Sequence, residues 1–562
     1  MRNPPHQRSD VRRLLFFYTI TLSLPIIFFL LTEGTLVLIH YGPDISLFYH
    51  VWMNGQEYLA MNPSVSSRYF FSTEFAPGSS PDAFLAQKPS NGIRVFCLGA
   101  STTAGYPYWY NAAFPSFLRD RLKAEFPDRP VEVVNLGITA TNSFAVLDMM
   151  RDVVREHPDA IVVYDGHNEF YGALGIASRE SLGSSRWLVN LSLRLIHSKA
   201  FMLLRNLYGG VVSSSRRAID ERSRATMMER MAASRTISYG SDEYWEGVNI
   251  FQKNVEATCS LCRDSGIPLL YCTQVSNLHD LPPFISVRRK GMTTEEQRTF
   301  DDTLRLATTL LHQGHLGDAD RLFRSLIAID SQCALARYDY AQCLEQQGQF
   351  PEATLHYKRA RDFDAVRFRA SDDINAVIRS VRPPCFPVDV ESSFAANSRH
   401  GFPGSDLIME HLHPSAYGQF LIAKEIAEAM QEHGIIIPRE EWTHKERFED
   451  DSLWEHRWVT TLDEIIARRK TEILTAGWPF HSSPLPISEI SIDDTLGQIS
   501  EMVVRGLWSW RHAHEAAGVF YVNKGDFFNA AAETGAIANT FPLDDDAQRQ
   551  WNEYKTLCSK RK

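Results

Sequence analysis

The sequence predicts an α/β fold with a parallel sheet between two layers of helices, and two observations support this prediction. Short apolar runs of strand type alternate with helical segments from about residue 92 onward. Three of these runs are followed by a glycine, at Gly99, Gly137 and Gly166, where a loop begins. Strand, loop and helix in this alternation are typical of parallel sheets whose strands are joined by helices.

The expected elements follow this order along the chain. The predicted strands are residues 93–98, 131–136, 160–164, 268–275 and 386–390. The predicted helices are residues 114–126, 143–156, 244–264 and 419–432. Because ligands bind at the carboxyl ends of parallel strands, the loops that begin at Gly99, Gly137 and Gly166 should lie together on one functional edge.

A helical repeat lies between the last two predicted strands. Gly314 and Gly348 are 34 residues apart. Further pairs share this offset, namely Ala307 and Ala341, Leu310 and Leu344, Ala319 and Ala353, Phe323 and Tyr357, and Asp330 and Asp364. The period and its small residues resemble the tetratricopeptide repeat, which implies a segment that binds a protein partner. A third, weaker copy lies near the C-terminus, at Gly518, Tyr521, Gly525, Ala530 and Pro542.

The N-terminus has the pattern of a membrane anchor. Residues 14–31 carry no charged side chain, Glu33 interrupts the apolar run, and residues 36–39 resume it. About 20 apolar residues span a bilayer, so residues 14–39 are long enough. A cleaved signal peptide has a shorter apolar core that ends at a small-residue site, and no such site follows here. The sequence therefore predicts one transmembrane helix.

Four arginines precede the apolar run, at Arg2, Arg8, Arg12 and Arg13. Positive charges that flank a transmembrane helix tend to remain on the cytoplasmic side. We therefore expect the chain beyond about residue 40 to lie outside the cytoplasm.

Composition excludes several other classes of protein. The chain has 562 residues, enough for two or three domains, and a net charge of −10, whereas a nucleic-acid binder normally shows a basic face. Its 8 cysteines are too few for a disulfide scaffold. Cys259 and Cys262 form a close pair, but they lie inside a helical pattern, and no second pair at ligand spacing accompanies them. We expect no metal, no organic cofactor and no nucleic-acid partner.

Ser101 follows the first predicted strand and a Gly-Ala turn, and so lies at the functional edge. A serine hydroxyl is a poor nucleophile unless a neighbouring base accepts its proton. Taken alone, the same serine could equally cap a helix, where its hydroxyl would accept a backbone N–H. The hypothesis of a nucleophile therefore depends on what the other loops supply.

Two later loops offer hydrogen-bond donors at the same edge. Gly137 ends the second predicted strand, and Asn168 follows the third. Acyl transfer builds negative charge on the carbonyl oxygen, and a glycine N–H or an asparagine amide can receive that charge. Each residue by itself would more often form a turn or a cap. The prediction of an oxyanion site therefore depends on their occurring together.

A fourth segment, Glu410-His-Leu-His413-Pro, precedes the last predicted helix of the sheet region. A histidine held by a carboxylate three residues upstream supplies a base together with its orienting partner. His411 is a neighbour of this pair, and Asp406 is a reserve candidate for the acid. Two histidines and a carboxylate could instead ligate a metal, but no third ligand cluster with suitable spacing is evident.

Taken together, the four segments resemble the SGNH hydrolase superfamily, also known as the GDSL-type esterases and lipases. The matches to the four blocks of the family are, in chain order, Gly99-Ala100-Ser101, Gly137, Gly166-His167-Asn168 and Glu410-His411-Leu412-His413-Pro414. The resemblance covers roughly residues 92–430 and is closest to bacterial members that carry tetratricopeptide repeats. The proline after His413 makes it the better match to the family histidine. Ala100 and Glu410 depart from the pattern, which has aspartate at both positions.

The resemblance implies a three-layer αβα, flavodoxin-like sheet and cleavage of acyl esters, such as acetyl or acyl groups on a carbohydrate or lipid. Ser101 would be the nucleophile, His413 the base and Glu410 its acid, while Gly137, Asn168 and the Ser101 N–H would receive the oxyanion. The protein would lie in the bacterial inner membrane with its catalytic domain in the periplasm. Two alternatives stay open: an O-acyltransferase that uses the same site on an extracellular polysaccharide, and a repeat-based scaffold with a vestigial hydrolase domain.

These observations predict a chain of six parts. They are a cytoplasmic stub and transmembrane anchor (1–40), a stem (41–91), the first part of the hydrolase domain (92–290), the repeat insertion (295–370), the second part of the hydrolase domain with its histidine (371–435) and a helical C-terminal region (436–562). Residues 187–204 are an amphipathic helix candidate, which would form a lid, lie on the membrane surface or pack as an ordinary surface helix.

Overall fold

The computed structural model describes residues 6–70, 77–178, 185–207, 227–232, 235–442 and 450–559. At its centre lies a five-stranded parallel sheet with strand order β5-β4-β6-β7-β8. The strands are β4 (Ile93–Gly99), β5 (Val131–Gly137), β6 (Ala160–Tyr164), β7 (Leu269–Cys272) and β8 (Cys385–Val388). Gly99 is in register with Gly137 on one side and with Tyr164 on the other, so these three strands end at one level.

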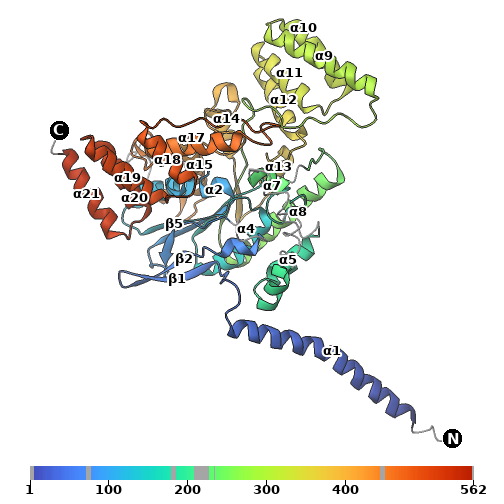
Figure 1. Ribbon diagram of the computed structural model, residues 1–562, viewed down its shortest axis with the longest axis vertical. Helices are drawn as coiled ribbons and strands as arrows, with labels where there is room; N and C mark the ends of the chain where they lie inside the picture. The colour runs from blue at the N-terminus through green and yellow to red at the C-terminus, as the bar shows by residue number, and fades with distance from the viewer. Residues whose placement is uncertain are drawn as a thin grey trace.

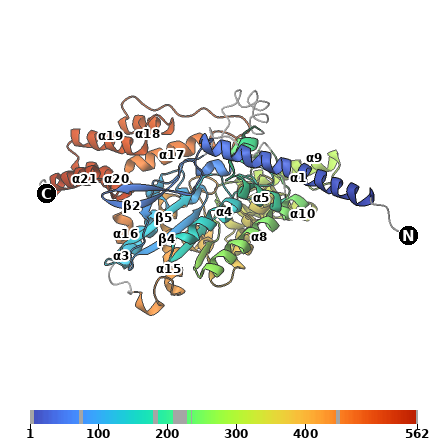
Figure 2. The ribbon, with the colours of Figure 1, turned by 90° about the horizontal axis from the view of Figure 1, so that it is seen from below.

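Helices cover both faces of this sheet (Figure 2), which confirms the predicted three-layer α/β class. Successive residues of β4 point to opposite faces, and both faces are buried: Phe96 and Leu98 belong to one core, and Val95 and Cys97 to the other. The first face is covered by α4 (Ser143–Val153), α8 (Asp242–Ser265) and α13 (Asp372–Arg379). The second is covered by α3 (Phe114–Glu125), α14 (Val390–Ala396) and α15 (Ala416–Glu432).

The segment that was expected to be a stem instead contains a small antiparallel sheet. Its strands are β1 (Phe48–Met53), β2 (Gln56–Met61) and β3 (Ala83–Leu85), in the order β1-β2-β3. Phe84 packs edge-on against Phe96 of the central sheet, with ring centroids 5.1 Å apart. These strands are short and separated by polar residues, so their sequence shows little periodicity although one side is buried. This part of the chain is therefore packed on the central sheet.

The N-terminal helix α1 (His6–Leu38) extends away from the globular part (Figure 1). Its segment Arg13–Leu38 is long and apolar enough to cross a membrane, and its most apolar 18-residue stretch has a mean hydropathy of 2.4 and is not buried by the rest of the protein. Arg2, one of the arginines that predict its orientation, lies outside the described residues.

The predicted repeats form two helix pairs that project from the sheet region between β7 and β8 (Figure 1). They are α9 (Thr294–His312), α10 (Leu316–Ile329), α11 (Ala334–Gln346) and α12 (Phe350–Phe363). The turn glycines Gly314 and Gly348 have φ values of +79° and +76°, which a residue with a side chain rarely adopts. Small residues are fully buried where the helices cross, at Ala307, Ala319, Ala341 and Ala353.

Helices also make up the C-terminal region on the other side of the molecule (Figure 1). They are α16 (Asp450–Glu455), α17 (Thr461–Thr475), α18 (Thr495–Val504), α19 (Trp510–Asn523), α20 (Phe527–Thr540) and α21 (Asp545–Ser559). The weak third copy of the repeat corresponds to α19 and α20, with Gly525 in the turn at φ +74° and Ala530 fully buried.

The remaining described helices are short. They are α2 (Ser101–Ala104), α5 (Arg186–Leu195), α7 (Met227–Ala232), η1 (Val65–Arg68), η2 (Tyr110–Ala112), η3 (Val154–Glu156), η4 (Arg399–Gly401) and η5 (Arg439–Glu441). The amphipathic helix expected over residues 187–204 is interrupted, because α5 ends at Leu195 and a new helical segment covers residues 199–207.

Candidate active site

The nucleophile candidate lies at the junction between β4 and α2. Ala100 is the N-cap residue of α2 and Ser101 is its first helical residue, so the Ser101 hydroxyl does not cap the helix. As the first residue of a helix, Ser101 also has a backbone N–H without an acceptor inside that helix. The side chain is almost fully buried, with 7% of the residue exposed. Ser101 therefore presents both a hydroxyl and an N–H at the carboxyl edge of the sheet.

Gly137 allows α2 to lie directly on the end of β5. A Cβ atom at this position would come within 2.4 Å of the Ala104 nitrogen and 2.7 Å of the Thr103 carbonyl carbon. The side chain of Asn135 fixes the same contact, since its Nδ2 donates to the Thr103 carbonyl oxygen at 2.6 Å and its Oδ1 accepts the Gly137 N–H at 2.9 Å. The N–H that was expected to face the oxyanion is thus occupied by Asn135.

Ser101, His413 and Glu410 form a continuous chain of contacts. The Ser101 Oγ lies 2.7 Å from His413 Nε2, and His413 Nδ1 contacts Glu410 Oε1. The Glu410 carboxylate also accepts the backbone N–H of His413 at 3.0 Å and that of His411 at 2.6 Å. Glu410 is thereby fixed by the loop that carries both histidines, and its longer side chain still reaches the imidazole. Asp406, the reserve candidate, is exposed and accepts only nearby backbone N–H groups.

Burial determines the charge state of the histidines at this site. It lowers the pKa of the His413 imidazole below its ordinary value, which favours a neutral ring able to accept a proton. It also lowers the pKa of the His411 imidazole well below its ordinary value, and the neighbouring His413, His167 and Arg369 act in the same direction. Burial thus favours the neutral ring, and the adjacent Glu410 carboxylate would stabilise the imidazolium once it forms.

Aromatic rings from distant segments surround the two histidines. The Tyr106 ring lies 4.6 Å from that of His413, centroid to centroid. Around His411 lie Phe284, Phe368 and Phe480, at 6.0, 6.0 and 5.6 Å. Of the aromatic residues that follow the nucleophile, Tyr106 faces the histidines, whereas Trp109 packs against the C-terminal region.

Sequence reasoning did not find these three phenylalanines. Phe284 follows β7, Phe368 follows the repeats, and Phe480 follows α17. The segment 275–283 also lies beside His411, since its Asn277 N–H donates to the His411 carbonyl at 2.9 Å. Only the folded chain shows that these segments meet at one imidazole.

Asn168 lies in the loop after β6 and is half-buried. Its neighbour His167 is held through Nδ1, which accepts the Ala370 N–H at 3.1 Å. Glu169 accepts the N–H and hydroxyl of Ser143, at 2.9 and 2.7 Å, and burial raises its pKa to about 7. The pKa of Asp165 beside it is raised well above its usual range by burial and by Glu169, while Glu169 anchors the loop through Ser143.

A metal-binding alternative for the same residues is weaker than the nucleophilic one. Glu410, His411 and His413 offer ligand atoms within 4.8 Å of one another, the one such group among the residues that the structure describes. However, both ring nitrogens of His413 are engaged, one by Ser101 and one by Glu410. A metal ligand needs a free nitrogen lone pair, so this geometry suits a base better than a ligand.

Comparison with known proteins agrees with this geometry. A buried serine, histidine and carboxylate in contact at the edge of a three-layer α/β sheet form an arrangement typical of serine hydrolases. Residues 95–198 match the family described as GDSL-like lipase/acylhydrolase, and residues 310–369 match the tetratricopeptide repeat. The protein therefore carries a GDSL-type ester hydrolase domain with inserted tetratricopeptide repeats.

Solved structures and curated sequences add little to this assignment. An acetyl xylan esterase, AlAXEase, is 12% identical, with a TM-score of 0.24 over 60% of this chain and 99% of its own. The acetylxylan esterase Axe2 from Geobacillus stearothermophilus is 12% identical, with a TM-score of 0.21 over 64% of this chain and 100% of its own. At TM-scores this low, neither structure bears on fold or substrate. No curated protein matches the sequence significantly.

Proposed function

We propose that the protein is a membrane-anchored serine esterase that cleaves acyl esters, such as acetyl or acyl groups on a carbohydrate or lipid. The observation that carries this proposal is the distance of 2.7 Å between Ser101 Oγ and His413 Nε2 in a buried site, with Glu410 on the other ring nitrogen. This arrangement is what nucleophilic attack by a serine requires, because the base lies within hydrogen-bond reach and is itself oriented.

The reaction would proceed through an acyl-enzyme. His413 takes the Ser101 proton as Oγ attacks the ester carbonyl carbon, and Glu410 stabilises the imidazolium that forms. When the tetrahedral intermediate collapses, the bond to the alcohol breaks and His413 returns the proton to the leaving oxygen. Water then attacks the acyl-enzyme, with His413 acting as base again, and releases the acid and free Ser101.

The oxyanion would be received by the Ser101 N–H and the Asn168 side chain. The Ser101 N–H has no acceptor within α2, and Asn168 Nδ2 donates no hydrogen bond to any described residue. Gly137, the third expected donor, would contribute only if its N–H left Asn135. We therefore propose that Gly137 acts mainly by letting α2 and its serine approach β5.

A fluorophosphonate probe in the full-length protein tests the nucleophile. The probe should label the native chain and fail to label Ser101→Ala. A matched control is Ser405→Ala, an exposed serine in the loop that leads to His413, which should keep full labelling. Labelling that persists in Ser101→Ala would show that another residue is the nucleophile.

Location and partners belong to the same proposal. The apolar helix α1 would anchor the chain in the bacterial inner membrane, with the catalytic domain in the periplasm, and the repeats would bind a protein partner. The support is the length and exposure of Arg13–Leu38 and the arginines that precede it. Protease added to spheroplasts should digest the catalytic domain, and protection of that domain would contradict this orientation.

A further inference from the structure

The segment 186–207 presents an unusually apolar outer face. On α5, Trp187 is 68% exposed and Leu188 46%, while Val189 and Leu193 on the opposite side pack into the core. The next helical segment also exposes two leucines, Leu204 and Leu207, which are 61% and 59% exposed. Surfaces of this kind usually contact another protein or a membrane.

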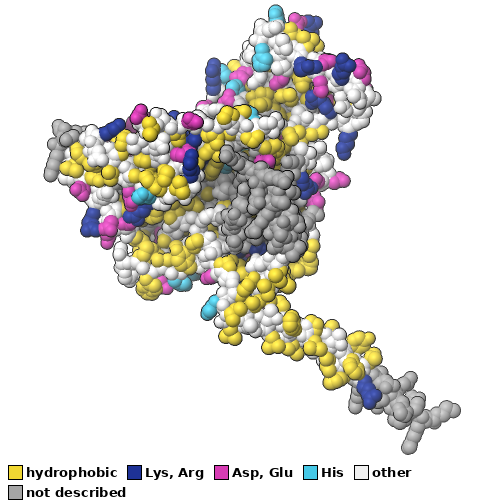
Figure 3. Space-filling view, viewed as in Figure 1, with side chains coloured by type: hydrophobic (Ala, Val, Ile, Leu, Met, Phe, Trp, Pro, Cys, Tyr) yellow, Lys and Arg dark blue, Asp and Glu magenta, His cyan; other side chains and the backbone are white. Residues whose placement is uncertain are grey.

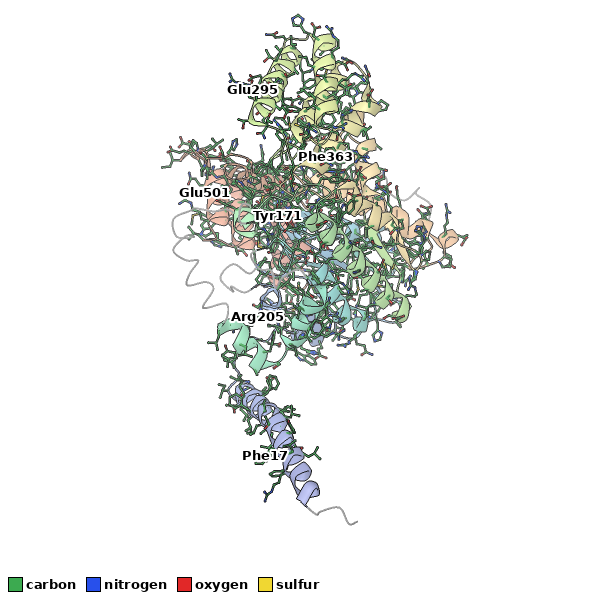
Figure 4. All side chains as sticks on the ribbon, turned by 90° about the vertical axis from the view of Figure 1, so that its right-hand side faces the viewer. Phe17, Tyr171, Arg205, Glu295, Phe363 and Glu501 are labelled. Atoms are coloured by element: carbon green, nitrogen blue, oxygen red, sulfur yellow. The ribbon has the colours of Figure 1, made fainter. Side chains whose placement is uncertain are left out.

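This segment is attached to the end of the anchor helix. The Glu33 carboxylate accepts the Ser198 hydroxyl at 2.7 Å and the backbone N–H groups of Lys199 and Ala200 at 2.9 and 2.7 Å. Glu33, the one acidic residue of the segment Arg13–Leu38, therefore caps the N-terminus of the 199–207 helix, where an anion is favoured. Figure 4 shows Arg205, on this helix, beside the end of α1.

Further contacts make this junction a packed one. Ile45, Ile196 and Met202 form a small buried cluster, and Tyr41 and Phe201 pack against it. Lys199 Nζ donates to the Pro43 carbonyl at 3.0 Å. Because Glu33 of α1 and the residues directly after α1 both contact the 199–207 helix, the position of α1 in a bilayer also fixes the depth of this helix.

The length of α1 sets that depth. Residues 14–32 rise about 28 Å at 1.5 Å per residue, which matches a hydrocarbon core of about 30 Å. Glu33 thus falls at the boundary between acyl chains and headgroups, and the helix that it caps falls at the same level. Figure 3 shows hydrophobic side chains gathered along α1 and at its junction with the globular part.

We propose that α5 and the 199–207 helix lie in the interfacial layer of the bilayer that α1 crosses, with Trp187, Leu188, Leu204 and Leu207 inserted among the lipids. The proposal rests on the anchor proposed above for α1. Tryptophan is favoured at headgroup level, and an amphipathic helix with one packed and one apolar face is suited to this position. The hydrolase would then be held against the membrane through two separate contacts.

Site-specific fluorescence in nanodiscs of phosphatidylcholine and phosphatidylglycerol tests this proposal. In a full-length Cys558→Ser background, in which the remaining cysteines are buried, single cysteines replace Leu188 or Leu204 and carry an NBD label. Lipids with a doxyl quencher should quench both labels at least about twofold more strongly than a label at Leu306. Leu306 lies on α9 and is 52% exposed, so it is the matched control.

A label at Leu24, inside α1, separates the two proposals. Quenching at position 24 together with positions 188 and 204 supports the interfacial contact. Quenching at position 24 alone, with iodide reaching the other two labels from water, overturns it and leaves the anchor intact. Labels at 188 and 204 that neither quencher reaches would show a protein contact instead, which also overturns it. A label at 24 that lipid does not quench would overturn the anchor itself.

Discussion

The inserted repeats and the C-terminal helices are both built from helix pairs with a glycine in the turn, but their interfaces contain different chemistry. Small and apolar side chains fill the core of the repeats, where Ala319, Phe323 and Ala353 are fully buried. In the C-terminal region, His514 lies between two carboxylates, 3.3 Å from Asp463 and 2.6 Å from Glu533, and all three are buried. One region is therefore held by apolar packing and the other depends on charge.

The two regions also approach the catalytic unit differently. Asp463 accepts hydrogen bonds from Asn111, in the loop after the nucleophile, at 2.9 Å and from Trp510 at 2.8 Å. Trp510 stacks on Trp109 of the same loop, with ring centroids 4.5 Å apart. The repeats contact loops that flank the histidines instead. The cluster of Asp463, His514 and Glu533 therefore supports the loop that follows Ser101, whereas the repeats support the loops that flank the two histidines.

Replacing His514 in one region or Phe323 in the other should give the largest changes in stability. His514→Ala leaves two buried carboxylates without their cation, which should cost about 3–5 kcal/mol of unfolding free energy. Phe323→Ala in the repeats should cost a similar amount, about 3–5 kcal/mol, through a cavity. Urea unfolding of the detergent-solubilised chain measures both. A loss below about 1 kcal/mol for His514→Ala would contradict the charge cluster.

The pH dependence of stability should distinguish the two regions. Burial alone would lower the pKa of His514, but Asp463 and Glu533 outweigh it and raise the pKa to about 9. A raised pKa stabilises the fold fully below the ordinary value of 6.5 and loses that contribution as pH rises through about 9. The loss should approach about 3 kcal/mol.

Urea midpoints measured at neutral pH and above the pKa of His514 check this expectation. The urea midpoint for unfolding of the C-terminal region should fall as the pH rises, both in the native chain and in Phe323→Ala. His514→Ala should lose that dependence. An equal fall in all three proteins would assign the pH effect to other groups.

The same contrast explains what the sequence could and could not predict. The central strands and the repeats carry local periodicity, so their places along the chain were predicted within a few residues. The sequence also nominated Ser101, Glu410 and His413, because each lies beside a strand end or a helix start. The cluster around His514 has no period or motif, since Asp463, His514 and Glu533 come from three helices and meet only after folding. The strands within residues 41–91 were missed because they are short, and because β3 meets β2 only after a long intervening segment.

The phenylalanines around His411 allow the two regions to be compared at the site itself. Phe368 follows the repeats and Phe480 follows α17, and their ring centroids lie 6.0 and 5.6 Å from that of His411. Phe368→Leu and Phe480→Leu should each lower kcat roughly tenfold, because a small displacement of the histidine loop misplaces the base. Hydrolysis of an activated acyl ester measures this.

Leu485→Ala is a control, since this exposed residue follows Phe480 on the same segment and should leave kcat unchanged. If only Phe368→Leu lowers kcat, the repeats alone position His411. If only Phe480→Leu does so, the C-terminal region has that role. Unchanged kcat in both variants would show that neither ring positions His411.

The smallest effect is expected at the contact between the repeats and the segment 275–283. His279 Nε2 lies 3.0 Å from Glu345 on α11, and its backbone carbonyl accepts the Tyr338 hydroxyl at 2.6 Å. The side-chain pair is partly exposed, so His279→Ala should cost only about 0.2–1 kcal/mol, while the Tyr338 hydrogen bond remains. Because Asn277 in the same segment contacts His411, unchanged kcat would mean that the repeats support this loop without controlling the base. A fall in kcat of more than about tenfold would mean that the repeats, and any partner bound to them, act on the site through His279.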